Sequence, residues 1–139
     1  RGAPYPSFVN FDANARLACR VKRPRSNTPL QALTLLNDPV YVEIAKAFAL
    51  SVAGETSEMS LDERLSWAFR RAVARLPRER EATTLRELYA EQLVNGRAVE
   101  VERFVADMQL PKSLSAAEYV ALYAVCTAIL NLDETISKN

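Results

Sequence analysis

Four carboxylates are the residues of this sequence whose chemistry could support catalysis. Asp12 and Asp38 lie in the N-terminal third of the chain, and Asp133 and Glu134 are adjacent near its C-terminal end. Two carboxylates that flank a glycosidic bond can act as acid and base, so this set could serve in hydrolysis of a carbohydrate. Each of the four also has a simpler role, as a helix cap or as a salt-bridge partner. The sequence therefore favours a domain without catalysis and keeps part of a hydrolase as the alternative.

The residues that the sequence lacks exclude several other chemistries. It contains no histidine, which removes the usual general base, the commonest zinc ligand and the proximal ligand of haem. It has no Cys-x-x-Cys-His motif, so this segment does not itself attach a c-type haem. Its three glycines are isolated, which excludes a glycine-rich phosphate loop. We expect neither a metal site nor a cofactor in this domain.

Composition indicates one globular domain with a substantial core. The chain has 139 residues, of which 49% are apolar and 25% charged. Its net charge of +1 argues against binding to nucleic acid or to a membrane surface. The longest apolar run, residues 116–130, is shorter than the ~20 residues that a membrane helix needs, so we expect no membrane span. The chain begins with Arg1 rather than Met, and we expect it to be part of a longer protein.

Residues 23–38 hold a dense group of polar side chains that allows two interpretations. Thr28 before Pro29 has the pattern of a helix N-cap, and Gln31 is placed to close a capping box. Asp38 has the same N-cap pattern and predicts the start of a second helix. We expect capping to be their main role. In the alternative they form a binding site together with neighbouring residues, the full set being Asp12, Arg23, Asn27, Thr28, Gln31, Asn37 and Asp38.

A second candidate surface combines a basic run with the single tryptophan. Arg20, Lys22 and Arg25 could bind an anionic partner, such as an acidic protein surface or a sulfated glycan. The simpler interpretation is a solvated strip, in which Arg23 pairs with Asp12 or Asp38. Trp67 falls nearly opposite the apolar stripe of its predicted helix. We expect the N-terminal arm to cover it, the alternative being exposure for a partner.

The hydrophobic periodicity predicts an all-α fold in one domain. Residues 1–26 should form an irregular N-terminal arm pinned by its aromatic residues, with one helical turn near residues 13–17. Residues 27–139 should form a bundle of about five to six helices around a central apolar helix, residues 116–130. The other helices are expected from residue 29, over 39–53, from residue 61, over 78–94 and over 98–108. We also expect Asn131, Asp133 and Glu134 to approach Asn37 and Asp38 in space.

The two cysteines, Cys19 and Cys126, are far apart in the sequence. A disulfide between them would be compatible with an exported protein. Two buried free thiols are the alternative that we favour, because free cysteine behaves as a small apolar residue.

Several motifs resemble the planctomycete-specific domain family, a domain of unknown function at the C-terminal end of long bacterial proteins. They are Phe11-Asp12, Cys19, Arg23, residues 27–33 (NTPLQAL), residues 36–38 (LND), residues 75–77 (RLP) with Glu81, and residues 130–134 (LNLDE). Arg78 departs from the Thr or Ser cap that is usual in the family, and Thr135 departs from its usual aromatic residue.

The resemblance implies a context rather than an activity. Parent proteins of the family often carry an export signal and an upstream c-type cytochrome domain, so the resemblance implies a periplasmic or otherwise exported location. Haem c would then belong to the upstream domain, and the partners would be other domains of the same protein. We therefore expect a non-catalytic structural or interaction module, with the hydrolase part or an anion- or protein-binding surface as alternatives. The sequence indicates neither the ligand nor the oligomeric state.

Overall fold

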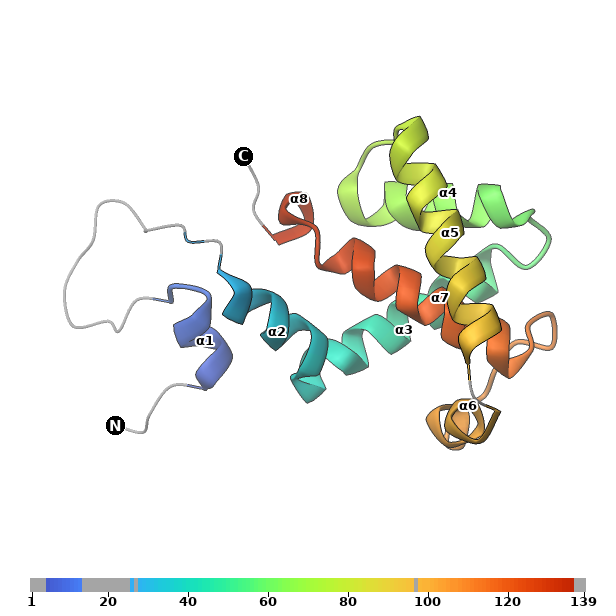
Figure 1. Cartoon of the computed structure of the whole chain (residues 1–139), viewed down its shortest axis with the longest axis horizontal. Coiled ribbons are helices and arrows are strands. Elements are labelled where there is room, and N and C mark those ends of the chain that lie inside the picture. The colour runs from blue at the N-terminus through green and yellow to red at the C-terminus, as the bar shows by residue number, and fades with distance from the viewer. Residues whose placement is uncertain (1–4, 14–25, 27, 97, 137–139) are drawn as a thin grey trace.

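The computed structural model of the chain describes residues 5–13, 26, 28–96 and 98–136 (Figure 1). These residues form helices and no strand, which confirms the predicted all-α fold. In chain order the helices are α1 (Pro6–Asn10), α2 (Pro29–Asn37), α3 (Pro39–Glu55), α4 (Leu61–Val73), α5 (Glu79–Asn95), α6 (Ala98–Val105), α7 (Ala116–Leu130) and α8 (Asp133–Ile136). The short α1 and α8 add to the five or six helices that the sequence predicts.

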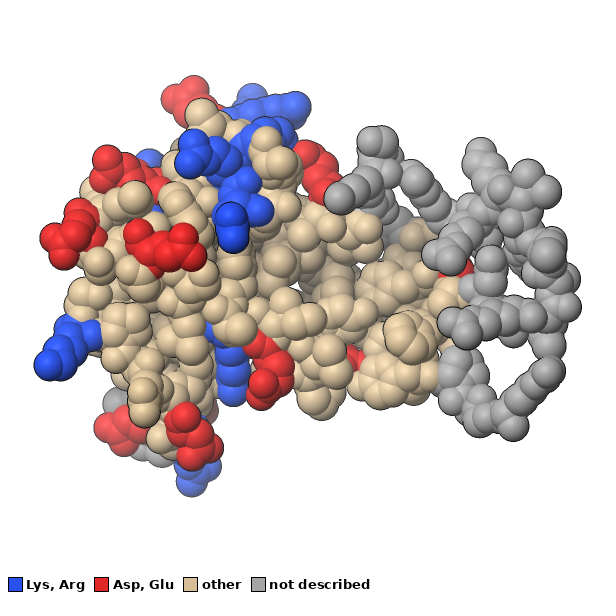
Figure 2. Space-filling view, turned by 180° about the vertical axis from the view of Figure 1, so that it is seen from behind, with Lys and Arg blue, Asp and Glu red and all other residues tan. Residues whose placement is uncertain are grey.

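Charged side chains are unevenly spread over the face seen in Figure 2. They gather over the α4 and α5 side of the molecule, whereas the region beside α2 is mostly uncharged. Within the described part of the chain, no helix has the length and apolarity needed to cross a bilayer.

The helix starts follow the capping signals of the sequence. Complete capping boxes in which a hydroxyl accepts the backbone bond are formed by Thr28 with Gln31, Ser60 with Glu63, and Ser115 with Glu118. At the start of α5, the Glu81 carboxylate accepts a hydrogen bond of 2.6 Å from the Arg78 N–H. The departure from a Thr or Ser cap at Arg78 therefore leaves the return bond from the third helical residue in place.

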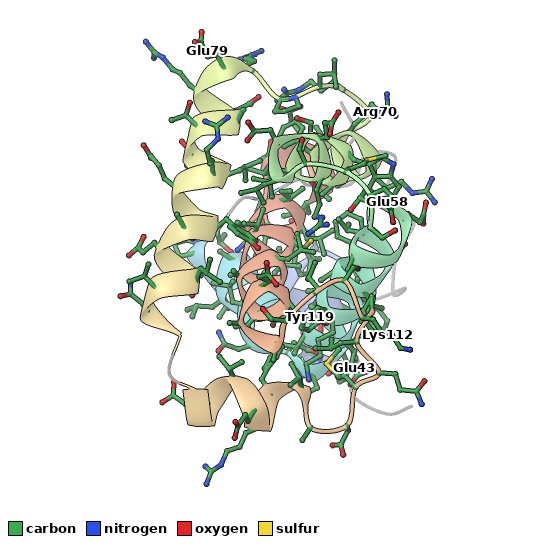
Figure 3. The ribbon with its side chains drawn as sticks, turned by 90° about the vertical axis from the view of Figure 1, so that its right-hand side faces the viewer. Glu43, Glu58, Arg70, Glu79, Lys112 and Tyr119 are labelled. Carbon is green, nitrogen blue, oxygen red and sulfur yellow. The ribbon has the colours of Figure 1, made fainter. Side chains whose placement is uncertain are left out.

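Helix α7 is packed on several sides by other helices. It contacts α3, α4, α5, α6 and α8, and Figure 3 shows it running between α5 on one side and α3 on the other. Its side chains Tyr119, Leu122, Val125 and Ile129 are fully buried. The Tyr119 hydroxyl donates a hydrogen bond of 3.0 Å to the Lys46 carbonyl, which satisfies the polar tip of this buried ring.

Cys126 also lies in this core as a free thiol. Burial raises the pKa of the thiol to about 12, so it is protonated and unreactive at neutral pH. The free-thiol interpretation is confirmed for Cys126, whereas Cys19 lies outside the described residues.

The N-terminal arm differs from the irregular, aromatic-anchored segment that the sequence predicts. It contains α1, which begins at Pro6 because proline is favoured at the first position of a helix. Phe8 is 60% exposed, and Tyr5 is also exposed, so these two rings do not anchor the arm, whereas the half-buried Phe11 packs against Tyr41. The helical turn expected near residues 13–17 lies outside the described residues, apart from Ala13.

Two helix ends also differ from the predictions. Helix α3 continues past Gly54 to Glu55, and Thr56 caps its end, because the buried Thr56 hydroxyl donates to the Val52 carbonyl and accepts from Arg64 Nε at 3.1 Å. These bonds satisfy the helix end without a left-handed glycine. Helix α6 ends at Val105, before the predicted boundary at Met108.

Candidate functional site

The described members of the predicted polar cluster connect the arm to α2. Gln31 is only 5% exposed, and its side-chain amide donates to the Asn10 carbonyl at 2.8 Å and to Ser26 Oγ at 3.1 Å. The Ser26 hydroxyl in turn donates to Asp12, which also accepts from the Ser26 N–H at 2.9 Å. This chain of hydrogen bonds closes the arm back onto the start of α2.

Asp38 fixes the other end of α2 and also holds α1. Its carboxylate caps α3 by accepting from the Val40 N–H at 3.0 Å, and it accepts from the Tyr5 hydroxyl at 3.0 Å and the Ser7 hydroxyl at 2.9 Å. Partial desolvation works to raise the pKa of Asp38, but the hydrogen bonds from Val40, Ser7 and Tyr5 outweigh it and hold the pKa below its ordinary value. The arm is thus held by these polar contacts and also by the half-buried Phe11 ring, whose centre lies 6.0 Å from that of Tyr41.

The remaining members of the cluster do not join these networks. The Asn37 side chain donates to the Leu33 carbonyl of its own helix at 2.9 Å. Arg23 and Asn27 lie outside the described residues. The described polar groups are therefore occupied by contacts within the chain, an arrangement that favours capping over ligand binding.

The second candidate surface is only partly described. Arg20, Lys22 and Arg25 lie outside the described residues. Trp67 is half-buried against the core, with the Arg71 guanidinium 6.0 Å from the centre of its ring. In the arm, α1 packs on α2, so the covering of Trp67 by the arm stays a prediction.

The structure brings together an ionic group that sequence reasoning did not identify. Arg75 lies 2.8 Å from Glu81 and 2.7 Å from Glu134, joining the corner between α4 and α5 to α8. Hydrogen bonding to Arg75 is the main reason why the pKa of Glu81 falls to about 2 and the pKa of Glu134 lies below its ordinary value. The signal was present in the sequence, because all three residues belong to the motifs that carry the family resemblance.

The carboxylates proposed for hydrolysis are directed to separate partners. Asp12 bonds to Ser26, Asp38 bonds to α1 and Val40, and Glu134 pairs with Arg75. The lowered pKa values of Asp38 and Glu134 are opposite to the raised pKa that a general acid needs. The polar ends of α2 and α8 are likewise not joined to each other by hydrogen bonds among the described residues.

Helix α2 turns Gln31 and Leu35 inward and exposes a row of three other leucines. Leu30 and Leu33 are each 56% exposed and Leu36 is 46% exposed, whereas Gln31 on the opposite face is buried. Residues three apart share one side of a helix, so these side chains form a continuous stripe, which we call the leucine face. The sequence predicts a helix from residue 29 without indicating which of its faces turns inward, and the burial of Gln31 is therefore a finding of the structure.

An open groove lies next to the leucine face. It has a volume of about 590 Å³ and is bounded by Leu36 of α2 and by Leu88 and Gln92 of α5. Its floor is one stripe of α7, which comprises Tyr123, Ala124, Thr127, Ala128 and Asn131. These positions recur at intervals of three or four residues and are only half-buried, so this side of α7 is partly open within the described part of the chain. The groove is lined by uncharged residues, and we call it the α7 groove.

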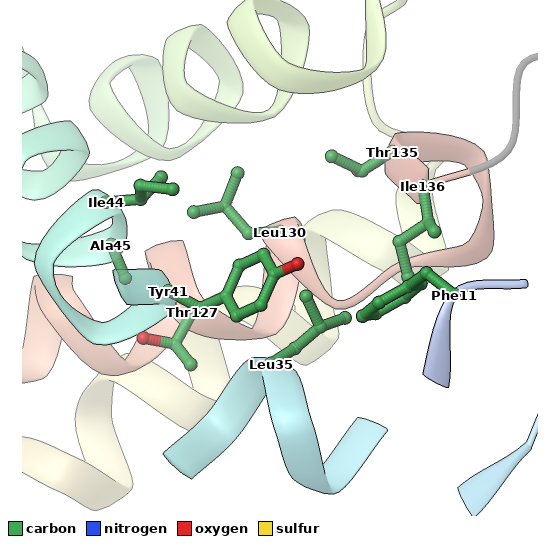
Figure 4. Close-up of a pocket in the computed structure, with 9 residues that line it drawn as sticks. All are labelled: Phe11, Leu35, Tyr41, Ile44, Ala45, Thr127, Leu130, Thr135 and Ile136. Atoms are coloured by element: carbon green, nitrogen blue, oxygen red, sulfur yellow. The ribbon is translucent and has the colours of Figure 1, made fainter. Parts of the chain in front are cut away.

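A smaller hollow lies on the other side of α2. Its volume is about 260 Å³, and it is lined by Phe11, by Leu35 of α2, by Tyr41, Ile44 and Ala45 of α3, by Thr127 and Leu130 of α7, and by Thr135 and Ile136 of α8. Figure 4 shows the Tyr41 ring within this group, with its hydroxyl directed into the hollow. The sequence could not predict this site, because it is assembled from five separate segments.

Comparison with known proteins identifies a family for this chain. Neither a search of curated proteins nor a search of solved structures found a significant relative. The profile of PSD1, described as a protein of unknown function (DUF1553), matches residues 1–89, which include α1, α2, α3 and the Arg75–Glu81 pair. This range covers more than half of the chain, so the chain belongs to the PSD1 family of planctomycete-associated domains of unknown function.

Proposed function

We propose that this domain is a non-catalytic helical interaction module that binds other domains of a larger exported bacterial protein. Its contact surface comprises the leucine face of α2 and the adjoining α7 groove. The observation that carries the proposal is the inverted orientation of α2, in which Gln31 is buried while Leu30, Leu33 and Leu36 are exposed. An ordinary surface helix turns its apolar residues inward, so this orientation favours a partner that covers them.

The chemistry of the surface indicates the kind of partner. No charged residue occurs in α2, and the α7 groove is lined by uncharged residues, so a charged partner surface would lose its hydration without gaining an ion pair. Two alanines four residues apart, Ala124 and Ala128, lie in the floor of the groove and would allow a helix to approach α7 closely. We therefore propose that the partner segment is an apolar helix, bound by the helix-in-groove mode.

The proposal that this domain belongs to a larger exported protein rests on the family resemblance rather than on the geometry of the surface. The resemblance to the planctomycete-specific domain family implies that this domain closes a long protein with an export signal, in which an upstream domain would carry haem c. In this proposal the present domain contributes the contact surface and no cofactor chemistry.

Photo-crosslinking in the full-length parent protein tests the proposal. A photoreactive p-benzoylphenylalanine at Leu33 should crosslink to a segment outside residues 1–139, and mass spectrometry would identify that segment. The matched control places the same group at Glu87, an exposed position on α5, where we expect no such product. Equal crosslinking from both positions, or none from position 33, would contradict the proposed contact surface.

A further inference from the structure

The hollow beside Tyr41 contains none of the three residues of the leucine face, and it shares Thr127 with the α7 groove. We propose that it binds a small neutral aromatic molecule that carries one oxygen able to form a hydrogen bond. This site would be a ligand site of the domain itself, and it does not depend on the binding of a partner helix.

The size and lining of the hollow fit a molecule of this kind. A cavity of about 150 Å³ lined by apolar side chains is large enough for benzene, so about 260 Å³ leaves room for a substituted or two-ring molecule. Most of the lining is apolar, from side chains such as Leu35, Leu130 and Ile136. Phe11 and Tyr41 contribute aromatic rings whose centres are 6.0 Å apart and tilted by 53°, and ring edges and faces favour contact with another ring.

The hydroxyl of Tyr41 is the reason why the ligand should carry a hydrogen-bond acceptor. Within the described part of the chain this hydroxyl makes no hydrogen bond, although it is directed into the hollow (Figure 4). The other two lining hydroxyls have donated their protons to helix carbonyls, Thr127 to Tyr123 at 2.9 Å and Thr135 to Ile129 at 2.9 Å. Tyr41 is therefore the lining group with a proton free to donate to a ligand oxygen.

The absence of charge selects a neutral ligand. None of the residues that line the hollow is acidic or basic. A charged molecule would lose its hydration on entry and gain no opposite charge in return. We therefore expect a phenol or an aromatic carbonyl compound to bind and the corresponding sulfonate to be rejected.

A fluorescence titration with 2-naphthol tests this assignment on the chain of 139 residues. We expect saturable binding by the wild-type chain and a three- to tenfold loss of affinity in Tyr41→Phe, because one neutral hydrogen bond contributes about 0.5–1.5 kcal/mol. Naphthalene, which lacks the oxygen, should bind wild type and Tyr41→Phe equally. The matched control is Tyr123→Phe, which removes a phenol hydroxyl in the α7 groove rather than in the hollow, and its affinity should equal that of wild type.

Other outcomes overturn the assignment. Lack of saturable 2-naphthol binding, equal losses in Tyr41→Phe and Tyr123→Phe, or equal binding of 2-naphthalenesulfonate would each do so. A Leu33→Gln variant separates this proposal from the proposed function, because it changes the leucine face and should leave naphthol affinity unchanged. Loss of naphthol binding in that variant would show that the ligand occupies the leucine face instead.

Discussion

Arg75 and Glu134 form an ion pair at 2.7 Å, although they lie 59 residues apart in the sequence. The same guanidinium lies 2.8 Å from Glu81 and 4.9 Å from the centre of the buried Phe69 ring. Arg75 thus connects the C-terminal helix α8 to the corner between α4 and α5. This corner lies in the part of the chain that the family profile matches, whereas Glu134 lies beyond it.

Replacing Arg75 should destabilise the domain more than removing either carboxylate alone. Arg75→Gln leaves two adjacent carboxylates without their cation, so we expect a lower melting temperature and release of α8. Thermal unfolding monitored by circular dichroism measures the first effect, and hydrogen exchange of residues 133–136 measures the second. The matched control is Arg86→Gln, because the exposed Arg86–Asp62 pair should contribute little. Equal effects of the two substitutions would contradict the connecting role of Arg75.

The lowered pKa of Glu81 predicts an acid-sensitive contribution to stability. The folded pKa is about 2, against an ordinary value of 4.5, so the folded state favours the ionised form. This contribution is complete above pH 4.5 and is lost as the pH falls toward 2. The free energy of unfolding of wild type, measured in urea, should therefore fall as the pH is lowered over this range. Glu81→Gln should be less stable than wild type at pH 4.5, and its free energy of unfolding should change less with pH. Parallel pH profiles for the two proteins would show that Glu81 is not the titrating group.

Gln31 should be more important for stability than the leucines beside it. Gln31→Leu removes the bonds to Asn10 and Ser26 and leaves a carbonyl of the arm without its donor, so we expect a loss of about 1–3 kcal/mol. Leu33→Gln changes an exposed side chain and should cost less than about 1 kcal/mol. Urea denaturation of both variants makes the comparison. A larger loss in Leu33→Gln would mean that the leucine face belongs to the core of this domain.

The core around α7 should respond strongly to loss of volume. Leu122 is fully buried, and Leu122→Ala should cost about 2–5 kcal/mol through lost burial and the cavity left behind. The control Leu76→Ala removes the same atoms from a side chain that is 64% exposed, and it should cost less than about 1 kcal/mol. Similar unfolding free energies for the two variants would contradict the placement of Leu122.

Local signals of the sequence predicted the helix starts well, because a capping box involves residues only three apart. Ser115 and Glu118 begin α7 as expected, and so do Thr28 and Gln31 at α2. Such bonds form within one turn of helix and need no information about the rest of the fold.

The features that the sequence did not reveal depend on distant contacts. The leucines of α2 have the pattern of a core helix, but the inward side of α2 is bonded to the arm, where the Gln31 amide donates to the Asn10 carbonyl and Asp38 accepts from the Ser7 hydroxyl. The Arg75–Glu134 pair and the Tyr41 hollow likewise join segments whose proximity no local pattern encodes.

The central claim is that the leucine face is a contact surface and not part of the core of this domain. One dissociation constant tests it most directly. It should be measured between this chain and the remainder of its proposed parent polypeptide, for wild type and for the combined variant Leu30→Gln, Leu33→Gln and Leu36→Gln. Burying one leucine contributes about 1.5–3 kcal/mol, so we expect the combined variant to bind at least a hundredfold more weakly while its own helical spectrum is retained. An unchanged dissociation constant, with the variant folded, would contradict the claim.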